Sequence, residues 1–276
     1  MKTFKVIGIC LLTIFSFYYT NKIIDFSKSK DPIMKKIIKE SENLNIPATD
    51  AQVFNNYIIP GESGSKIDID KSYERMKKVG SYNENLLVFI NDYPKISINN
   101  NLNKYIIQGN ENKEAISIVF NLNNSKYVDK LMQILKENKI ETTFFIDGKW
   151  GVENKDILKL ITESNHKIGN KGYDNRYKKS DIAKTNNLIK SITKTNNKFC
   201  LTTTINDELL LSCKNKNMYT IKPKIINFNT EITLKKGDIY LLEINSKTIE
   251  HIEIFINYIK QKGYEIINLD KMIEEK

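Results

Sequence analysis

The chain has 276 residues, which is enough for one barrel-sized domain and a smaller unit. Hydrophobic residues make up 40% and charged residues 28%, which excludes a disordered tail. With two histidines and three cysteines, the sequence excludes a metal centre of three histidines, a dense disulfide framework and a zinc ribbon. The net charge of +10 would attract polyanions, but the lysines are scattered as on a solvated face, and no motif indicates nucleic acid as a partner.

The N-terminus has the pattern of an export signal. Lys2 and Lys5 precede an uncharged run over 6–20, and no small-residue cleavage site follows. We therefore predict a signal anchor, or transmembrane segment, over 1–24 and a stalk over 25–35. This makes the chain a single-pass protein of the cell membrane with its bulk extracytoplasmic. The alternatives are a secreted protein and a buried N-terminal helix.

Residues 36–112 are predicted to form a small α/β accessory segment. Asp68 and Asp70 alternate with isoleucines, which predicts the solvated face of a strand. The PGESG stretch at 60–64 is read as a turn, because a phosphate-binding loop would need more glycines and a following Lys-Ser or Lys-Thr. The expected elements around this segment are helices at 34–44 and 71–79, and strands at 67–70, 86–90 and 105–109.

From residue 113 onward, short apolar runs alternate with amphipathic segments. Apolar strands that are buried on both faces and alternate with helices indicate a parallel sheet. Six or seven such units over 113–276 predict a closed or nearly closed β/α barrel. Strands are expected at 116–120, 142–146, 166–170, 199–205, 218–223, 225–227, 238–244 and 265–268, with helices at 125–138, around 157–161, at 181–193, from 207 and at 248–261, and a short one at the end.

Function in such a barrel belongs to the ends of the strands. The residues at the predicted strand ends are Asn121, Leu122 and Asn123, Asp147, residues 170–175, residues 200–204, Glu243 and Asn245.

These strand ends carry a resemblance. The stretches VFNLNN (119–124), ETTFFIDGKW (141–150), HKIGNKGYDNR (166–176) and KKGDIYLLE (235–243) resemble, in this order, the motifs of the polysaccharide deacetylase (NodB-homology) family. The resemblance covers about 113–276 and implies an irregular (β/α)7 barrel. It also implies a hydrolase of C–N bonds in non-peptide amides that uses a divalent metal.

The chemical residues of the family pattern are replaced here. The family's general base and first metal ligand fall on Asn121 and Leu122, and its two histidine ligands fall on Lys171 and Asn175. Its Arg-x-Pro-Tyr stretch starts at Cys200, and its general-acid histidine falls on Glu243. Without metal ligands there is no activated water. Loss of the general base lowers the reaction rate by a further ~10²–10⁴-fold. We therefore predict a degenerate member with no catalytic residue, no metal and no cofactor.

Several alternatives remain open at these positions. Asp147, Asp174 and Glu243 could hold a cation through hard oxygen ligands. The ammonium of Lys171 could instead pair with one of these carboxylates, or could simply be solvated. The single pair Cys200–Cys213 could be a bridge or two buried thiols.

Three functions fit this pattern. The first is an anchored, inactive deacetylase-like protein that binds cell-wall glycan, with Trp150, Tyr173 and Tyr177 as stacking candidates. The second is an active peptidoglycan or chitin-like deacetylase with rearranged catalytic groups. The third is a scaffold for protein interactions in the envelope. His166 matches a family histidine outside the metal set, so we expect it to serve packing or hydrogen bonding.

Overall fold

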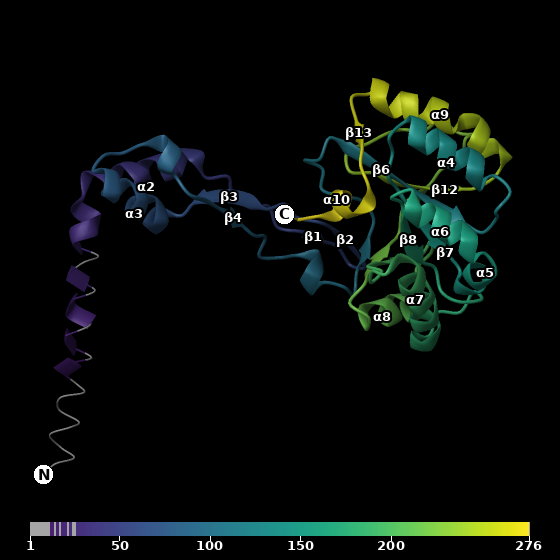
Figure 1. Cartoon of the computed structure of the whole chain (residues 1–276), viewed down its shortest axis with the longest axis horizontal. Helices are drawn as coiled ribbons and strands as arrows, with labels where there is room; N and C mark the ends of the chain where they lie inside the picture. The colour runs from purple at the N-terminus through teal and green to yellow at the C-terminus, as the bar shows by residue number, and fades with distance from the viewer. Residues whose placement is uncertain (1–11, 14, 17, 21, 24–25, 276) are drawn as a thin grey trace, which may run out of the picture. The chain divides into compact units, whose positions relative to one another are not determined.

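The computed structural model of the chain describes residues 12–13, 15–16, 18–20, 22–23 and 26–275 (Figure 1). The predicted anchor over 1–24 lies largely outside these residues, and the described residues between 12 and 30 are helical. Within the part that the structure describes, no helix combines the length and the apolar character needed to cross a membrane. The anchor therefore stays a prediction.

The chain forms two compact units, which we call the N-terminal unit (residues 1–48 and 63–93) and the barrel unit (residues 49–62 and 94–276). These divisions differ from the boundaries expected from the sequence. Residues 49–62 and 94–112, which the sequence grouped with the accessory segment, belong to the barrel unit.

The N-terminal unit packs two helices beside a two-stranded antiparallel sheet. Strand β3 (Gly64–Ile67) pairs antiparallel with β4 (Phe89–Asp92), and the helices are α2 (Pro32–Leu44) and α3 (Ile69–Val79), with a 3₁₀ turn at Glu84–Leu86. Helix α3 ends at Gly80, whose φ of 78° is the left-handed conformation that glycine adopts without strain. The small core of this unit consists of Met34, Ile37, Ile67, Tyr73 and Met76.

The strand predicted over 67–70 is wrong beyond Ile67. Asp68 caps α3, because its side chain accepts a hydrogen bond from the Lys71 amide at 3.0 Å. Asp70 lies in the first turn of the same helix, where a carboxylate is stabilised by the helix dipole. Alternating isoleucines over four residues are too short a pattern to outweigh a good N-cap.

The barrel unit contains the strands and helices that the alternating pattern predicted, in the predicted order, although the strand expected over 199–205 ends at Leu201. It also contains a helix at 148–153 and two short strands at 52–53 and 57–59 that the sequence did not predict. In chain order the elements of this unit are β1 (Gln52–Val53), β2 (Tyr57–Ile59), a 3₁₀ turn (Ile98–Asn100), β5 (Tyr105–Ile106), β6 (Ala115–Leu122), α4 (Val128–Glu137), β7 (Thr143–Ile146), α5 (Gly148–Glu153), α6 (Lys155–Glu163), β8 (Lys167–Asn170), α7 (Lys179–Thr193), β9 (Phe199–Leu201), α8 (Asp207–Lys214), β10 (Tyr219–Ile221), β11 (Lys224–Ile225), β12 (Ile239–Glu243), α9 (Ser246–Gln261), β13 (Glu265–Ile266) and α10 (Leu269–Ile273).

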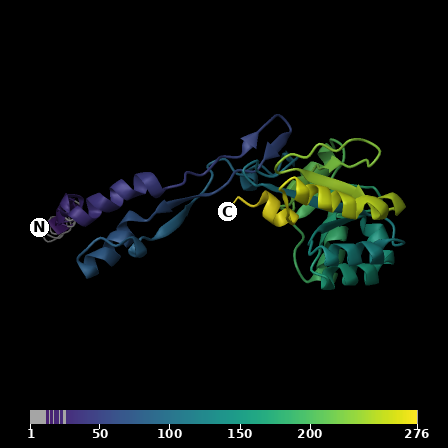
Figure 2. The ribbon, with the colours of Figure 1, turned by 90° about the horizontal axis from the view of Figure 1, so that it is seen from above.

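One curved sheet organises this unit, in the order β1-β2-β5-β10-β9-β8-β7-β6-β12-β11, with β13 paired to β6. Every pair in it is parallel except β1 with β2. Helices α4 and α9 lie side by side over β6 and β12 (Figures 1 and 2). The α/β class and the parallel sheet are confirmed. Full closure is not shown, because no pair among the described strands joins β1 to β11.

Strand β6 is buried on both faces, and its alternation decides where its last side chains point. Phe120 and Leu122 belong to the core cluster that β6 forms with α4, α6 and α9. Val119 belongs to the other cluster, together with Phe145 and Leu241. Leu122 therefore faces the helices, and Asn121 faces the opposite side of the sheet.

Candidate functional site

The carboxyl ends of four neighbouring strands meet at the predicted site. In the parallel register, Asn121 of β6 lies opposite Glu243 of β12 and Phe145 of β7, and Ile146 of β7 lies opposite Asn170 of β8. Lys171 follows β8 directly. The sheet order thus brings together side chains that are up to 122 residues apart in the chain.

A continuous hydrogen-bonded chain crosses this edge, which we call the Lys–Asn–Glu chain (Lys171, Asn121 and Glu243). The Lys171 Nζ donates to Asn121 Oδ1 at 3.0 Å. The Asn121 Nδ2 donates to both oxygens of Glu243, at 2.7 and 2.9 Å. Asn123 adds a second amide donor to Glu243 Oε2 at 3.2 Å. Asn121 is only 5% exposed, so this arrangement satisfies a buried amide on both sides.

Lys171 makes no direct ion pair with Asp147, Asp174 or Glu243 among the described residues, so the direct pairing considered from the sequence is wrong. The reason lies in the strand order. Strands β8 and β12 are separated by β7 and β6, about 14 Å along the sheet at the usual spacing. The lysine side chain reaches Asn121 on β6, and the amide connects the ammonium to the carboxylate.

Asp147 and Asp174 are engaged elsewhere. Asp147 caps α5, with Oδ1 accepting from the Lys149 amide at 2.8 Å and Oδ2 accepting from the Asn175 amide at 3.0 Å. Asp174 forms an ion pair with Lys149 at 3.0 Å, and this hydrogen bond lowers the pKa of the Asp174 carboxyl. Asp174 and Asn175 both have φ of 55°, in a tight left-handed turn. These contacts fasten the turn to α5 and do not direct the carboxylates toward Glu243.

The divalent metal of the family does not fit the residues present. The side chain of Leu122 is fully buried in the core that faces the helices. At the first histidine position, Lys171 contributes a positive charge and binds Asn121. Within the described ranges, no group of three or more His, Cys, Asp or Glu side chains could hold a metal ion. A hard cation needs several oxygen ligands directed at one point, and this arrangement does not provide them.

Cys200 is not exposed at the site. It forms a disulfide with Cys213, and both residues are fully buried. Of the two alternatives left open by the sequence, the structure has the bridge. It fastens β9 to α8 on the side of the sheet away from Glu243.

His166 packs as expected. Its Nδ1 accepts a hydrogen bond from the Thr142 amide at 3.2 Å, and its ring meets Phe144 edge-on at 5.4 Å. Burial lowers the pKa of the His166 imidazole, so the neutral form is favoured.

The three stacking candidates have different environments. Trp150 packs against the main core, and Tyr177 packs against the cluster that holds the disulfide. Tyr173 is half-buried on the turn after β8, with Lys184 Nζ 5.3 Å from its ring centre. Of the three, Tyr173 is the ring placed on the same turn as the Lys–Asn–Glu chain.

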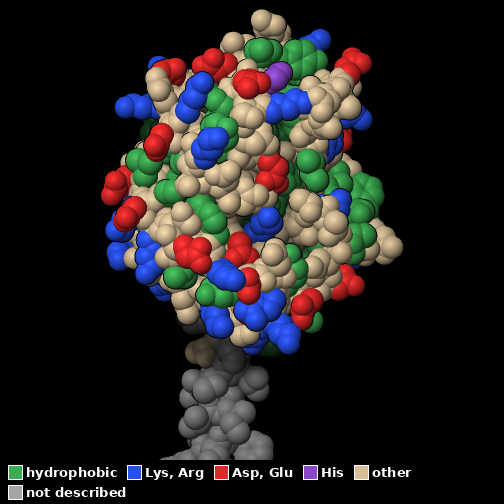
Figure 3. Space-filling model, turned by 90° about the vertical axis from the view of Figure 1, so that its right-hand side faces the viewer, with side chains coloured by type: hydrophobic (Ala, Val, Ile, Leu, Met, Phe, Trp, Pro, Cys, Tyr) green, Lys and Arg blue, Asp and Glu red, His purple; other side chains and the backbone are tan. Residues whose placement is uncertain are grey.

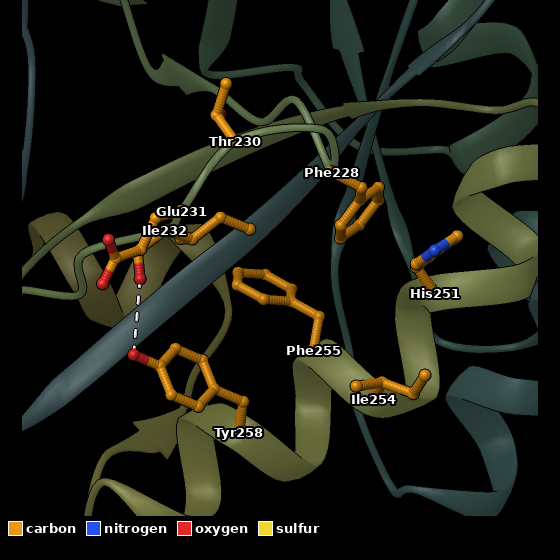
Figure 4. Close-up of a pocket in the computed structure, with 8 residues that line it drawn as sticks. All are labelled: Phe228, Thr230, Glu231, Ile232, His251, Ile254, Phe255 and Tyr258. Carbon is orange, nitrogen blue, oxygen red and sulfur yellow. Dashed lines mark hydrogen bonds between the residues drawn. The ribbon is translucent and has the colours of Figure 1, made fainter.

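Sequence reasoning missed a hollow beside α9. Its volume is about 340 Å³. Figure 4 shows the ring of His251 beside Phe228, and their centroids are 5.3 Å apart. Tyr258 closes the other end by donating to the Ile232 carbonyl at 3.3 Å. The irregular 226–234 segment forms one wall, and such a segment has no periodic signal in the sequence.

On the face shown in Figure 3, Lys and Arg are interspersed with Asp and Glu, as the scattered lysines predicted.

Residues 108–209 match the model of the polysaccharide deacetylase family. The uncharacterized protein YlxY of Bacillus subtilis is 23% identical over 280 residues, covering 91% of this chain and 86% of that protein. The crystal structure of BA3943 of Bacillus anthracis, described as a CE4 family pseudoenzyme, is similar with a TM-score of 0.69 and 23% identity, over 90% of this chain and 96% of the other. A family 4 carbohydrate esterase of the same organism is similar with a TM-score of 0.56 and 22% identity, over 62% of this chain and 87% of the other. The predicted resemblance to the polysaccharide deacetylase family is thus confirmed, and the structural likenesses show the fold.

Proposed function

We propose that this deacetylase-like chain is catalytically inactive and binds cell-wall glycan at the carboxyl ends of β6, β8 and β12. The observation that carries the proposal is the Lys–Asn–Glu chain. It places an amide where the family pattern has a general base, and an ammonium where that pattern has a metal ligand. A buried amide cannot take a proton from water, and an ammonium repels a cation.

The same groups suit sugar recognition. Glu243 accepts, Lys171 donates, and Asn123 is an exposed amide that can do both. Tyr173 provides a half-buried ring on the adjoining turn. Sugars offer hydroxyl and amide groups for such partners, and an apolar face for a ring. A mutant of BA3943 is described as a pseudoenzyme with restored enzymatic activity, which supports the view that a chain of this fold can lose catalysis while it keeps its fold.

The predicted anchor is part of the proposal. The lysines at positions 2 and 5 and the uncharged run over 6–20 would hold the chain at the outer face of the cell membrane, where the glycan lies.

The test is binding of the full chain to purified peptidoglycan and to soluble oligomers of N-acetylglucosamine, at an ionic strength of about 0.15 M, where exposed charges are screened within about 8 Å. We expect Lys171→Met to weaken binding at least about tenfold, since a hydrogen bond to a charged group contributes about 1.5–3 kcal/mol. Lys130→Met removes the same charge from an exposed position on α4 and should change binding less than about twofold. Equal effects of the two substitutions would show diffuse charge attraction, and no binding at all would refute the proposal.

A further inference from the structure

Another hollow lies at the end of the strands opposite to the Lys–Asn–Glu chain. Residues 196–198 lead into β9 and residues 216–217 lead into β10, and these two strands are parallel. Together with α7 they enclose a cavity of about 420 Å³, which we call the lysine pocket. It therefore lies at the amino ends of the strands, whereas the Lys–Asn–Glu chain lies at their carboxyl ends.

The charge of the lysine pocket is of one sign. Lys190, Lys198 and Lys216 line it, and its lining includes no Asp or Glu. The three lysines are exposed, and none forms an ion pair with a carboxylate of the described residues. On a chain where most acidic and basic side chains are interspersed, three unpaired ammonium groups around one hollow form a local excess of positive charge.

The dipoles of the neighbouring helices offset only part of this positive charge. Helices α7 and α8 both end near the pocket, and each C-terminus carries about half a negative charge. Lys190 lies in the last turn of α7 and complements it. Three ammonium groups against two half-charges leave about two positive charges, so the pocket as a whole attracts anions.

The floor of the pocket is fixed. The Asn186 Oδ1 accepts from Asn170 Nδ2 at 2.8 Å and from Asn197 Nδ2 at 3.1 Å. The Asn197 Oδ1 accepts from the Phe199 amide at 3.0 Å. The disulfide Cys200–Cys213 joins the strand and the helix whose ends form two of the walls. A preorganised floor reduces the entropy lost when a ligand is ordered.

The lysine pocket adjoins a neighbouring hollow of about 410 Å³. The two share part of their lining, namely Asn196, Asn197 and Lys198. Thr193 and Thr195 add hydroxyl groups to the neighbouring hollow. Lys167 and Asp270 also line it, and they form an ion pair with each other, so these two side chains add no excess charge to it. A ligand longer than a single phosphate would therefore find amides and hydroxyls next to the cationic end.

We propose that the lysine pocket binds a phosphodiester group carried on a polyol chain. The ammonium groups would pair with the phosphate oxygens, and the amides and hydroxyls would meet the polyol. The lining of the lysine pocket includes no aromatic ring, and the two rings that line the adjoining hollow, His166 and Phe199, are buried against Phe144 and Tyr219. Neither hollow therefore offers an exposed ring on which a nucleobase could stack, which favours a polyol over single-stranded nucleic acid. This site does not depend on the glycan proposal.

The experiment titrates the full chain with poly(glycerol phosphate), inorganic phosphate and a single-stranded oligonucleotide with the same number of phosphates. The pocket variant is Lys190→Gln/Lys198→Gln/Lys216→Gln. The control variant, Lys130→Gln/Lys136→Gln/Lys155→Gln, removes the same charge from exposed positions on α4 and α6 that have no ion pair among the described residues.

We expect poly(glycerol phosphate) to bind, and to bind more tightly than inorganic phosphate because it reaches both hollows. Each exposed charge contact should contribute about two- to threefold in affinity. Loss of all three should therefore weaken binding of the polymer by about tenfold or more in the pocket variant, and by less than about twofold in the control. Equal losses in the two variants would overturn the site, as would no binding of the polymer. Tighter binding of the oligonucleotide would overturn the choice of a polyol.

Discussion

Leu122→Asp restores the carboxylate that the family pattern has at this position, and the structure predicts that it damages the fold. Leu122 is fully buried and faces the helix layer. Loss of a buried leucine costs about 2–5 kcal/mol, and an unpaired carboxylate in the same place adds several kcal/mol more or takes up a proton.

The charge contribution can be separated by pH. Burial raises the pKa of the introduced carboxyl in the folded chain above its value of about 3.9 in the unfolded chain. The folded chain then binds more protons than the unfolded chain, so stability is greatest at low pH and falls as pH rises between the two values. Over two pH units in that window the loss is about 2.7 kcal/mol.

The assay is urea unfolding at pH 4, 5, 6 and 7.5. Leu122→Asn is the matched control, because it has nearly the same shape and cannot ionise. We expect the two variants to have similar free energies of unfolding at pH 4 and to diverge above it. Parallel curves across this range would refute the reasoning, since they would mean that the side chain at position 122 reaches water at the strand ends.

Three further predictions concern the site and its support. Replacing both cysteines of the Cys200–Cys213 bridge with Ala should lower the free energy of unfolding by about 3 kcal/mol, because the bridge closes a loop with a sequence separation of 13. The same change should lower Tm by about 6–12 °C, and an unchanged Tm would contradict this. Lys171→Met leaves the buried Asn121 Oδ1 without its donor and should lower the free energy of unfolding by about 1–3 kcal/mol, against about 0.5 or less for an exposed lysine changed in the same way. Since burial lowers the pKa of His166, stability should fall as pH drops below the ordinary histidine value near 6.5, and an NMR titration midpoint above 6.5 would show this to be wrong.

The sequence predicted the parts of the fold that depend on local pattern. Strand β6 and helix α4 follow from an apolar run and from apolar residues at helical spacing. It did not predict the division into units, because that depends on a contact across the chain. Glu275, near the end, accepts hydrogen bonds from the amides of Gly61 at 2.8 Å and Ile98 at 3.1 Å, and no local pattern predicts this.

The candidate site was predictable as a set of residues and not as a network. Asn121, Lys171 and Glu243 were each identified by their place at a strand end. Which of them touch depends on sheet order and register, because β7 and β6 separate β8 from β12. Asn123 was identified only as a strand-end residue. The hydrogen bond that its side-chain amide donates to Glu243 follows from the same register.

The central claim is that the strand ends have lost the groups that bind a metal and activate water. The most direct test measures metal content by mass spectrometry on the purified full chain, together with acetate release from acetylated glucosamine oligomers in the presence of added Zn²⁺, Co²⁺ or Ni²⁺. We expect far less than one metal ion per chain and no acetate release above the protein-free control. One ion per chain, with acetate release that Glu243→Ala abolishes, would contradict it.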